Sequence, residues 1–165
     1  MGTSSGLFKI NPETKLIESF KNSHEDKTSL SSNDVRSIIT SIDGHTWVGT
    51  ANGGLNKYVE ETNSFERYSA NEGLPDNTIY TLAEDEEKKL WLGTNKGLCW
   101  FDPITLQSQQ YLPEDGVQSS EFNTNAVCKT SDDWLLFGGI NGFNMFSPLQ
   151  LFIYFHKILF FNDLP

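Results

Sequence analysis

The feature that most constrains this chain is a sequence pattern that recurs about every 44 residues. "TWVGTANGGLNKY" begins at Thr46 and "LWLGTNKGLCWFDP" begins at Leu90, so that Trp47 and Trp91 lie 44 residues apart. A looser copy, "LLFGGINGFNMFSP", begins at Leu135, and "GTSSGLFKINP" near the start of the chain matches "GTNKGLCWFDP" without a gap. Repeats of about 40–50 residues are typical of propellers, solenoids and arrays.

A second pattern keeps the same spacing. "LSSNDVRSI" begins at Leu30 and "LPDNTIYTL" begins 44 residues later at Leu74, while "VQSSEFNTN" from Val117 is a looser third copy. The two patterns together divide the chain into a partial repeat over residues 1–29, repeats over 30–73, 74–115 and 116–148, and an apolar tail over 149–165. Because Met1 lies inside the first repeat, we expect the sequence to be part of a longer protein.

Each repeat is predicted to form four short strands. In the third repeat, the segments "TIYTLAED", "LWLGT", "LCWFD" and the stretch before Tyr111 are separated by turns rich in Gly, Asn, Asp and Pro. No segment shows a sustained helical period. We therefore predict an all-β fold of β-propeller blades, each a four-stranded antiparallel meander, in an incomplete ring of about three and a half blades. The first repeat lacks its innermost strand, and the last has no clear outer strand.

We predict structural roles for the repeated tryptophans and glycines. We expect Trp47 and Trp91 to fill the space between neighbouring blades, with stacking on a ligand as the alternative. Glycines in the turns between the second and third strands are expected to adopt positive φ, which glycine reaches without steric cost. These glycines are Gly53, Gly54, Gly97 and Gly142.

The composition argues against several classes of function. Lys and Arg number 12 against 22 Asp and Glu, for a formal charge of −10, so we expect no nucleic-acid partner. The three His and two Cys have no metal-ligand spacing, and no Ser/His/Asp or Cys/His set stands out, so we predict no cofactor. The apolar stretch "LFIYFHKILFF" is shorter than the roughly 20 residues that a membrane-spanning helix needs.

The motifs together resemble two-component regulator propeller repeats. The resemblance covers about nine-tenths of the chain. It is carried by "LSSNDVRSI…DGHTWVGTANGGLNKY", "GLPDNTIYTLAEDEEKKLWLGTNKGLCWFDP" and "EFNTNAV…WLLFGGINGFNMFSP". Such repeats form the sensor region of hybrid histidine kinase/response regulator proteins of Bacteroides type. The tail "LQLFIYFHKILFFNDLP" departs from the family, which continues into a strand-rich sandwich domain.

This resemblance implies a function for the parent protein more than for the segment. It implies a periplasmic position within an inner-membrane sensor, with a membrane connection only through other parts of the parent chain. The parent is expected to be a histidine kinase, whereas this segment carries no kinase motif and is expected not to be an enzyme. In the family, the ligands are breakdown products of polysaccharides, so an oligosaccharide is the expected ligand.

A candidate binding site follows from propeller geometry. Because strands alternate in direction, the loops that precede the innermost strands share one rim with the turns between the second and third strands. That rim carries Asn33 and Asn77 as well as turn asparagines, whose amides can bind sugar hydroxyls or serve only turn geometry. Arg36, Tyr80 and Asn123 occupy one repeat position that varies, and they either contact ligand or pack between blades. The candidate ligand-binding residues are Arg36, Tyr80, Asn123, Asn52, Asn95 and Asn141.

Two further functions remain open. Similar Trp-x-Gly-Thr strands occur in metal-dependent propeller lyases, which need converging histidines and acids. The repeats could also act only as a structural scaffold for dimerisation. Because an incomplete ring exposes strand edges, we expect the segment to self-associate into a homo-oligomer.

Overall fold

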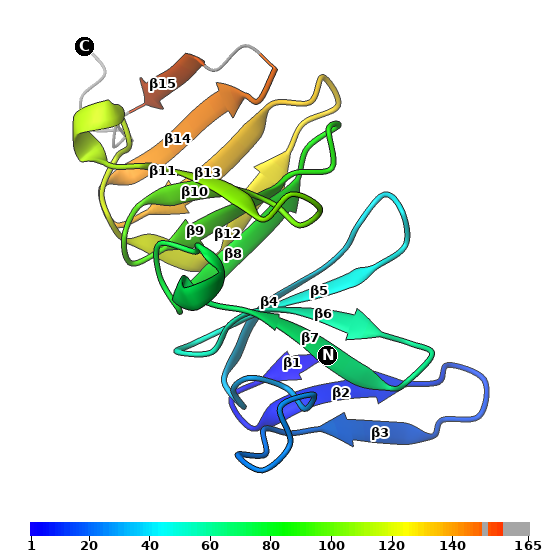
Figure 1. The fold of residues 1–165 in the computed structure, drawn as a ribbon. Coiled ribbons are helices and arrows are strands. Elements are labelled where there is room, and N and C mark those ends of the chain that lie inside the picture. The colour runs from blue at the N-terminus through cyan, green and yellow to red at the C-terminus, as the bar shows by residue number, and fades with distance from the viewer. Residues whose placement is uncertain (150–151, 157–165) are drawn as a thin grey trace.

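The computed structural model describes residues 1–149 and 152–156. Its strands form four antiparallel sheets that follow one another along the chain, which we call blades 1 to 4 (Figure 1). Within each blade the strands are hydrogen-bonded in chain order. Blade 1 contains β1 (Gly2–Thr3), β2 (Gly6–Ile10) and β3 (Ile17–Phe20); blade 2 contains β4 (Val35–Thr40), β5 (Thr46–Thr50), β6 (Gly54–Val59) and β7 (Ser64–Tyr68). Blade 3 contains β8 (Ile79–Glu84), β9 (Leu90–Thr94), β10 (Leu98–Asp102) and β11 (Gln107–Tyr111), and blade 4 contains β12 (Phe122–Lys129), β13 (Leu135–Gly139), β14 (Gly142–Ser147) and β15 (Phe152–His156).

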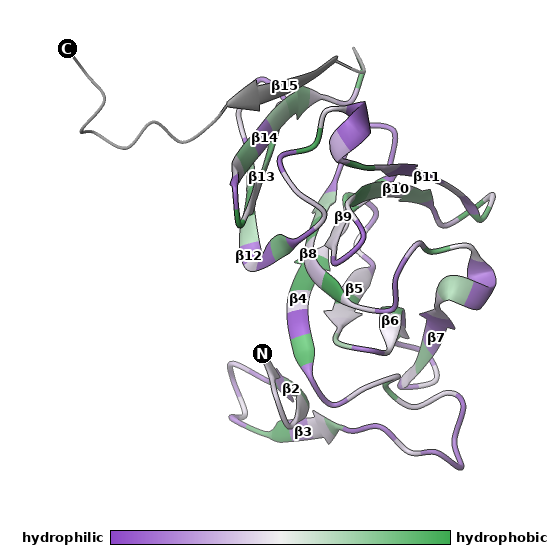
Figure 2. Cartoon of the chain, turned by 90° about the vertical axis from the view of Figure 1, so that its left-hand side faces the viewer, coloured by the Kyte–Doolittle hydropathy of each residue, from purple (hydrophilic) through white to green (hydrophobic). Residues whose placement is uncertain are grey.

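This arrangement confirms the predicted all-β propeller architecture, and the ring is open. Blades 2 to 4 have four strands each and blade 1 has three. Two short 3₁₀ helices, Ala70–Glu72 and Pro113–Asp115, lie in the connections that lead into blades 3 and 4. Hydrophobic and hydrophilic segments follow one another along β4 (Figure 2).

The two terminal blades differ in how well their strands were predicted from the sequence. In blade 1, β1 matches the second strand of the other blades, so the expected absence of an innermost strand among the described residues holds. In blade 4, where the sequence showed no clear outer strand, the tail supplies one, because Phe152–His156 pairs with Phe143–Ser147 of β14. That segment of the apolar tail is rich in the aromatic and β-branched residues that favour strands. The remainder of the tail, residues 150–151 and 157–165, lies outside the described residues.

The repeated tryptophans pack between blades, as predicted. Trp47 and Trp91 are each 2% exposed. Trp47 of blade 2 shares a hydrophobic cluster with Leu90 and Phe101 of blade 3. Trp91 of blade 3 lies 4.5 Å, between ring centroids, from Phe146 of blade 4. The core is therefore a series of layers between sheets, and an indole ring fills the layer between blades 2 and 3 and the layer between blades 3 and 4.

The glycine of the Trp-x-Gly-Thr strand has a role that the sequence did not reveal. A Cβ atom on Gly93 would lie 2.9 Å from the Cβ of Phe122, which belongs to the innermost strand of blade 4. On Gly49 it would lie 2.8 Å from Cγ2 of Ile79, in the innermost strand of blade 3. Both distances are too short for a real contact, so this glycine allows the innermost strand of the next blade to approach closely.

The turn glycines tie each blade to its neighbour. Gly54, Gly97 and Gly142 have positive φ, as predicted, but Gly53 does not, so that expectation is wrong. The backbone N–H of Gly54 donates to the Asn77 carbonyl oxygen at 2.7 Å. The N–H of Gly97 donates to the Ser120 carbonyl oxygen at the same distance. Each of these two turns is therefore anchored on the loop that leads into the next blade.

Candidate functional site

The predicted rim exists in the structure. The loops that precede β4, β8 and β12, which we call the leading loops, lie beside the turns that join the second and third strands. The hydrogen bonds from Gly54 to Asn77 and from Gly97 to Ser120 cross directly between these two sets of segments. Candidate residues on the leading loops and on the turns therefore share one side of the molecule.

The asparagines on this rim divide into two groups. The Asn33 side-chain oxygen accepts a hydrogen bond from the Asn22 N–H at 2.7 Å, and that of Asn77 accepts from the Ala70 N–H at 2.8 Å. These two equivalent residues fix the shape of their own loops. The three candidates on the turns, by contrast, have exposed side chains at the rim: Asn52, Asn95 and Asn141.

The variable repeat position coincides with a β-bulge in every innermost strand. The pairing register skips Arg36 between Val35 and Ser37, and it skips Tyr80 between Ile79 and Thr81. In β12, the irregularity between Phe122 and Val127 contains Asn123. A bulge leaves residues outside the regular ladder and redirects their side chains. The three candidates therefore occupy a repeated irregularity along the axis, which the sequence alone did not indicate.

A polar cavity of about 400 Å³ lies among the innermost strands. We call it the axial cavity. It brings Arg36 together with Thr124 and Asn125, but Tyr80 and Asn123 are not among its lining residues. The sequence missed Thr124 and Asn125 because the bulge in β12 spans four residues, whereas those in β4 and β8 span one. The remaining lining residues are Gly2, Thr3, Ser4, Asp34, Val35, Ser37 and Ile38.

The Arg36 guanidinium, at this cavity, has hydrogen-bond donors that are not used within the protein. Its Nη2 donates to Oδ2 of Asp34 at 2.6 Å, which holds the guanidinium in place. Its Nε is buried and has no hydrogen-bond partner, and the same is true of the neighbouring Ser37 hydroxyl. Buried polar atoms are normally paired, so unpaired ones beside a cavity are candidate ligand contacts. A guanidinium suits a carboxylate or a polyhydroxylated ligand.

The possible metal ligands among the described residues are dispersed, and the two cysteines differ in burial. Within residues 1–149 and 152–156, no group of three or more His, Cys, Asp or Glu side chains is placed to hold a metal ion. Cys99 is buried, and burial raises the pKa of its thiol to about 12, whereas Cys128 is exposed. No helix in the same residues is long and apolar enough to cross a membrane.

The repeat motifs match a known family. The model of the two component regulator propeller family matches residues 29–52 and 73–96, which span the leading loop and first two strands of blades 2 and 3. These two segments match two-component regulator propeller repeats. A curated relative, histidine kinase P4 of Formosa agariphila, is 42% identical over 157 residues. The match covers 92% of this chain but 11% of that protein, so the chain spans about a tenth of its relative.

Solved structures agree on the architecture of these repeats. The extracellular domains of two hybrid two-component systems from B. thetaiotaomicron superpose with TM-scores of 0.77 and 0.74 at 23% and 24% identity. These matches cover 92% and 99% of this chain, and 20% and 21% of those chains. Virginiamycin B lyase of Staphylococcus aureus has a TM-score of 0.69 at 16% identity, covering 96% of this chain and 50% of the lyase. At these identities the structures show a shared fold. With the family match, they show that the chain folds as propeller blades.

Proposed function

We propose that this chain is part of the periplasmic ligand-sensing region of a hybrid sensor histidine kinase, and that it binds a polysaccharide-derived saccharide. The supporting observation is the axial cavity, which is lined by Arg36, whose Nε is buried and unpartnered, in a chain that matches two-component regulator propeller repeats. Catalysis and membrane attachment would then belong to other parts of the parent protein.

The pattern of repetition favours a ligand at this place. Residues that seal the blades recur at equivalent positions, as Trp47 and Trp91 do, because every blade interface needs them. At the bulge, by contrast, the side chains differ in every blade: Arg36, Tyr80 and Asn123. A position that is geometrically repeated but chemically different is suited to one asymmetric ligand.

The cavity also has the dimensions and chemistry for a saccharide. Small-molecule sites are usually about 300–1,000 Å³, and this one is about 400 Å³. Hydroxyl and amide groups of Thr124 and Asn125 can exchange hydrogen bonds with sugar hydroxyls. Arg36 adds a positive charge, already oriented by Asp34, that would favour a saccharide bearing a carboxylate. We therefore expect acidic oligosaccharides to bind more tightly than neutral ones.

A glycan panel tests this proposal. Calorimetric titration of the purified chain with neutral and uronic-acid oligosaccharides should detect binding, with the strongest signal from an acidic member. Arg36→Gln should weaken that binding at least about tenfold, the size expected for losing a charge-assisted hydrogen bond. Lys27→Gln is the matched control, because Lys27 is exposed in the loop before β4 and does not line the cavity. An equal loss in both variants, or binding that Arg36→Gln leaves intact, would refute the site.

We also propose that the chain self-associates. The glycine of blade 4 that matches Gly93 is Gly138, and a Cβ on it would meet only Ala126 of its own blade. Exposed aliphatic side chains lie at both ends of the row of blades: Ile10 and Ile17 in blade 1, and Ile140 and Leu149 near blade 4. Multi-angle light scattering should therefore report a mass above that of one chain, and a monomer at all concentrations would contradict the proposal.

A further inference from the structure

A buried asparagine fastens the leading loops of blades 2 and 4 to their own blades. Asn56 and Asn144 occupy the same repeat position on the third strand, and both are fully buried. The Asn56 side-chain oxygen accepts a hydrogen bond from the Ser31 N–H at 2.9 Å, and the Asn56 amide donates to the Ser31 hydroxyl at 2.8 Å. The Asn144 side-chain oxygen accepts from the Gln118 N–H at 2.9 Å. We call this pairing of an asparagine with the leading loop the asparagine clamp.

The leading loop of blade 3, residues 74–78, lacks both partners of the clamp. Pro75 stands at the repeat position of Ser31, and proline has no N–H to donate. Cys99 replaces the asparagine, and its buried thiol donates to the Trp100 carbonyl oxygen of the same strand. Because donor and acceptor are lost together, no buried amide is left unpaired in blade 3.

The backbone contacts of the leading loops differ in the same way. In blade 2 the Ala51 N–H donates to the Asp34 carbonyl oxygen at 2.8 Å, and in blade 4 the Ile140 N–H makes the equivalent bond at 3.4 Å. In blade 3, among the described residues, no hydrogen bond joins the leading loop to β9, β10, β11 or their turns. The Ser108 hydroxyl comes nearest, but it donates to the carbonyl oxygen of Gly73, just before the loop.

Blade 2 holds the leading loop of blade 3 instead. The Gly54 N–H donates to the Asn77 carbonyl oxygen at 2.7 Å, and the Asn52 N–H donates to the Thr78 hydroxyl at 3.1 Å. At the start of the loop, Leu74 is buried in the hydrophobic cluster between blades 2 and 3. The loop is therefore bonded across the blade boundary and not to the blade that it enters.

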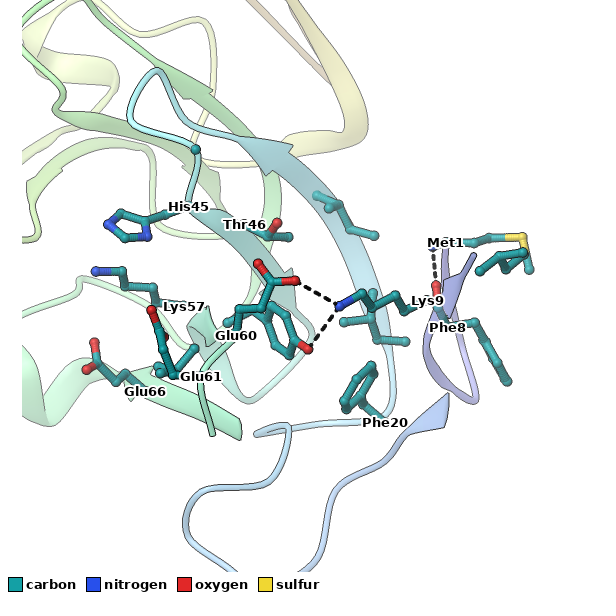
Figure 3. Close-up of a pocket in the computed structure, with 16 residues that line it drawn as sticks. Met1, Phe8, Lys9, Phe20, His45, Thr46, Lys57, Glu60, Glu61 and Glu66 are labelled. Atoms are coloured by element: carbon teal, nitrogen blue, oxygen red, sulfur yellow. Dashed lines mark hydrogen bonds and ion pairs between the residues drawn. The ribbon is translucent and has the colours of Figure 1, made fainter. Parts of the chain in front are cut away.

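The boundary between blades 1 and 2 is held differently. There an ion pair crosses between the blades, with Lys9 Nζ 3.2 Å from Glu60 Oε1 and 3.4 Å from the Tyr58 hydroxyl (Figure 3). No ion pair between described residues crosses from blade 2 to blade 3. Outside the loop, the Ile42 N–H donates to the Glu84 carboxylate across that boundary. The polar connection between blades 2 and 3 therefore runs mainly through the leading loop of blade 3.

We infer that the leading loop of blade 3 is a movable segment of the rim, which follows blade 2 when blades 2 and 3 shift relative to each other. Pro75 and Cys99 release it from blade 3, while Gly54 and Asn52 carry it with blade 2. The loop continues into β8, whose bulge holds Tyr80, so the shift also displaces the start of an innermost strand. This mobility does not depend on which ligand the chain binds.

Restoring the clamp tests the inference. The double variant Pro75→Ser/Cys99→Asn gives blade 3 the residues that blade 2 has in Ser31 and Asn56. In NMR hydrogen exchange on the 165-residue chain, the amides of residues 76–78 should exchange at least about tenfold more slowly in the double variant than in the parent, because opening must then break buried hydrogen bonds. Neither single variant should slow exchange, because each supplies only one partner. A double variant no slower than the parent, or an equal effect of one single variant, would refute the inference.

A second pair of variants tests which blade holds the loop. Thr78→Val removes the hydroxyl that accepts the Asn52 N–H, so the amides of residues 76–77 should exchange at least about threefold faster. Thr94→Val is the matched control, because the Thr94 hydroxyl donates to the Gly97 carbonyl oxygen within the turn of blade 3 and does not reach the loop. Exchange is compared with that of β9 amides, which report global unfolding. Equal acceleration by both variants, or none by Thr78→Val, would overturn the assignment of the loop to blade 2.

Discussion

Replacing Gly93 by alanine tests the claim that neighbouring blades are joined by close approach of their innermost strands. The new methyl group would lie 2.9 Å from the Phe122 Cβ in blade 4 and 2.6 Å from the Thr81 Cγ2 in its own blade. Both neighbours are held in the interior of the sheet stack, so neither can move aside freely. The Gly93 backbone does not have the positive φ that favours glycine, so the effect of the methyl group comes from this contact.

The expected cost follows from two opposing contributions. Forcing an extra methyl group into a packed interior destabilises a protein by about 1–3 kcal/mol. Replacing glycine by alanine also restricts the unfolded chain, which stabilises by about 0.4–1 kcal/mol. Gly93→Ala should therefore lower the free energy of unfolding by about 1–2 kcal/mol. With a urea slope of about 2 kcal/mol/M, this loss lowers the unfolding midpoint by roughly 0.5–1 M.

Gly138→Ala is the matched control, because Gly138 occupies the same repeat position in blade 4, and among the described residues no further blade lies against it. Its new methyl group would meet only the Ala126 Cβ, at 3.1 Å, and the Ala126 carbonyl oxygen, at 3.6 Å. We expect this variant to lose less stability than Gly93→Ala, at most about 1 kcal/mol, because its single tight approach is longer than both of the contacts at Gly93. Urea unfolding of all three proteins, followed by circular dichroism and fluorescence, compares them. Equal destabilisation by both substitutions would show that the glycine serves its own strand and not the interface.

Three further predictions address the core, the cysteines and acid stability. Trp91→Ala should lower the free energy of unfolding by about 3–5 kcal/mol in urea titrations, because it leaves a ring-sized cavity between blades 3 and 4, and a loss below about 1 kcal/mol would contradict this. A thiol reagent at neutral pH should modify the exposed Cys128 rapidly and Cys99 only upon unfolding, because burial raises the pKa of Cys99 to about 12. Mass spectrometry of the labelled peptides identifies which cysteine has reacted, and rapid labelling of Cys99 in the folded protein would contradict the prediction. Hydrogen bonds from Ser69 lower the pKa of Glu72 below its ordinary 4.5, so the stability from this contact is present above that pH and is lost as pH falls through the folded-state value. The melting temperature of Glu72→Gln should therefore approach that of the parent between pH 5 and 3, and a constant difference would argue against the contact.

The fold was predictable because the residues that determine the blade architecture recur at equivalent positions of the sequence repeat. A tryptophan that recurs every 44 residues reports an interface that recurs with it, and short strands between turn residues indicate the meander within each blade. The outer strand of blade 4 was missed because Phe152–His156 does not resemble the corresponding strands of the other blades. Strand pairing there depends on β-favouring side chains and on the free edge of β14, and neither follows the repeat.

The candidate site was predictable only in part, for a different physical reason. The repeat places Arg36, Tyr80 and Asn123 at one position, and all three do lie at bulges of innermost strands. Which side chains share a cavity depends on the length of each bulge, and the longer irregularity in β12 presents Thr124 and Asn125 to the cavity of Arg36. The length of a bulge depends on how the strands pair, and the repeat pattern of the sequence does not indicate it.

Repetition therefore separates two kinds of position in this chain. Between blades, the side chains at Trp47 and Trp91 are alike because these two interfaces present the same shape. Along the axis, the backbone irregularity is repeated while the side chains at it are not, so Arg36, Tyr80 and Asn123 give each blade a different group at this position. Of these three residues, Arg36 lines the axial cavity, and for that reason it is the residue on which a sensing role depends.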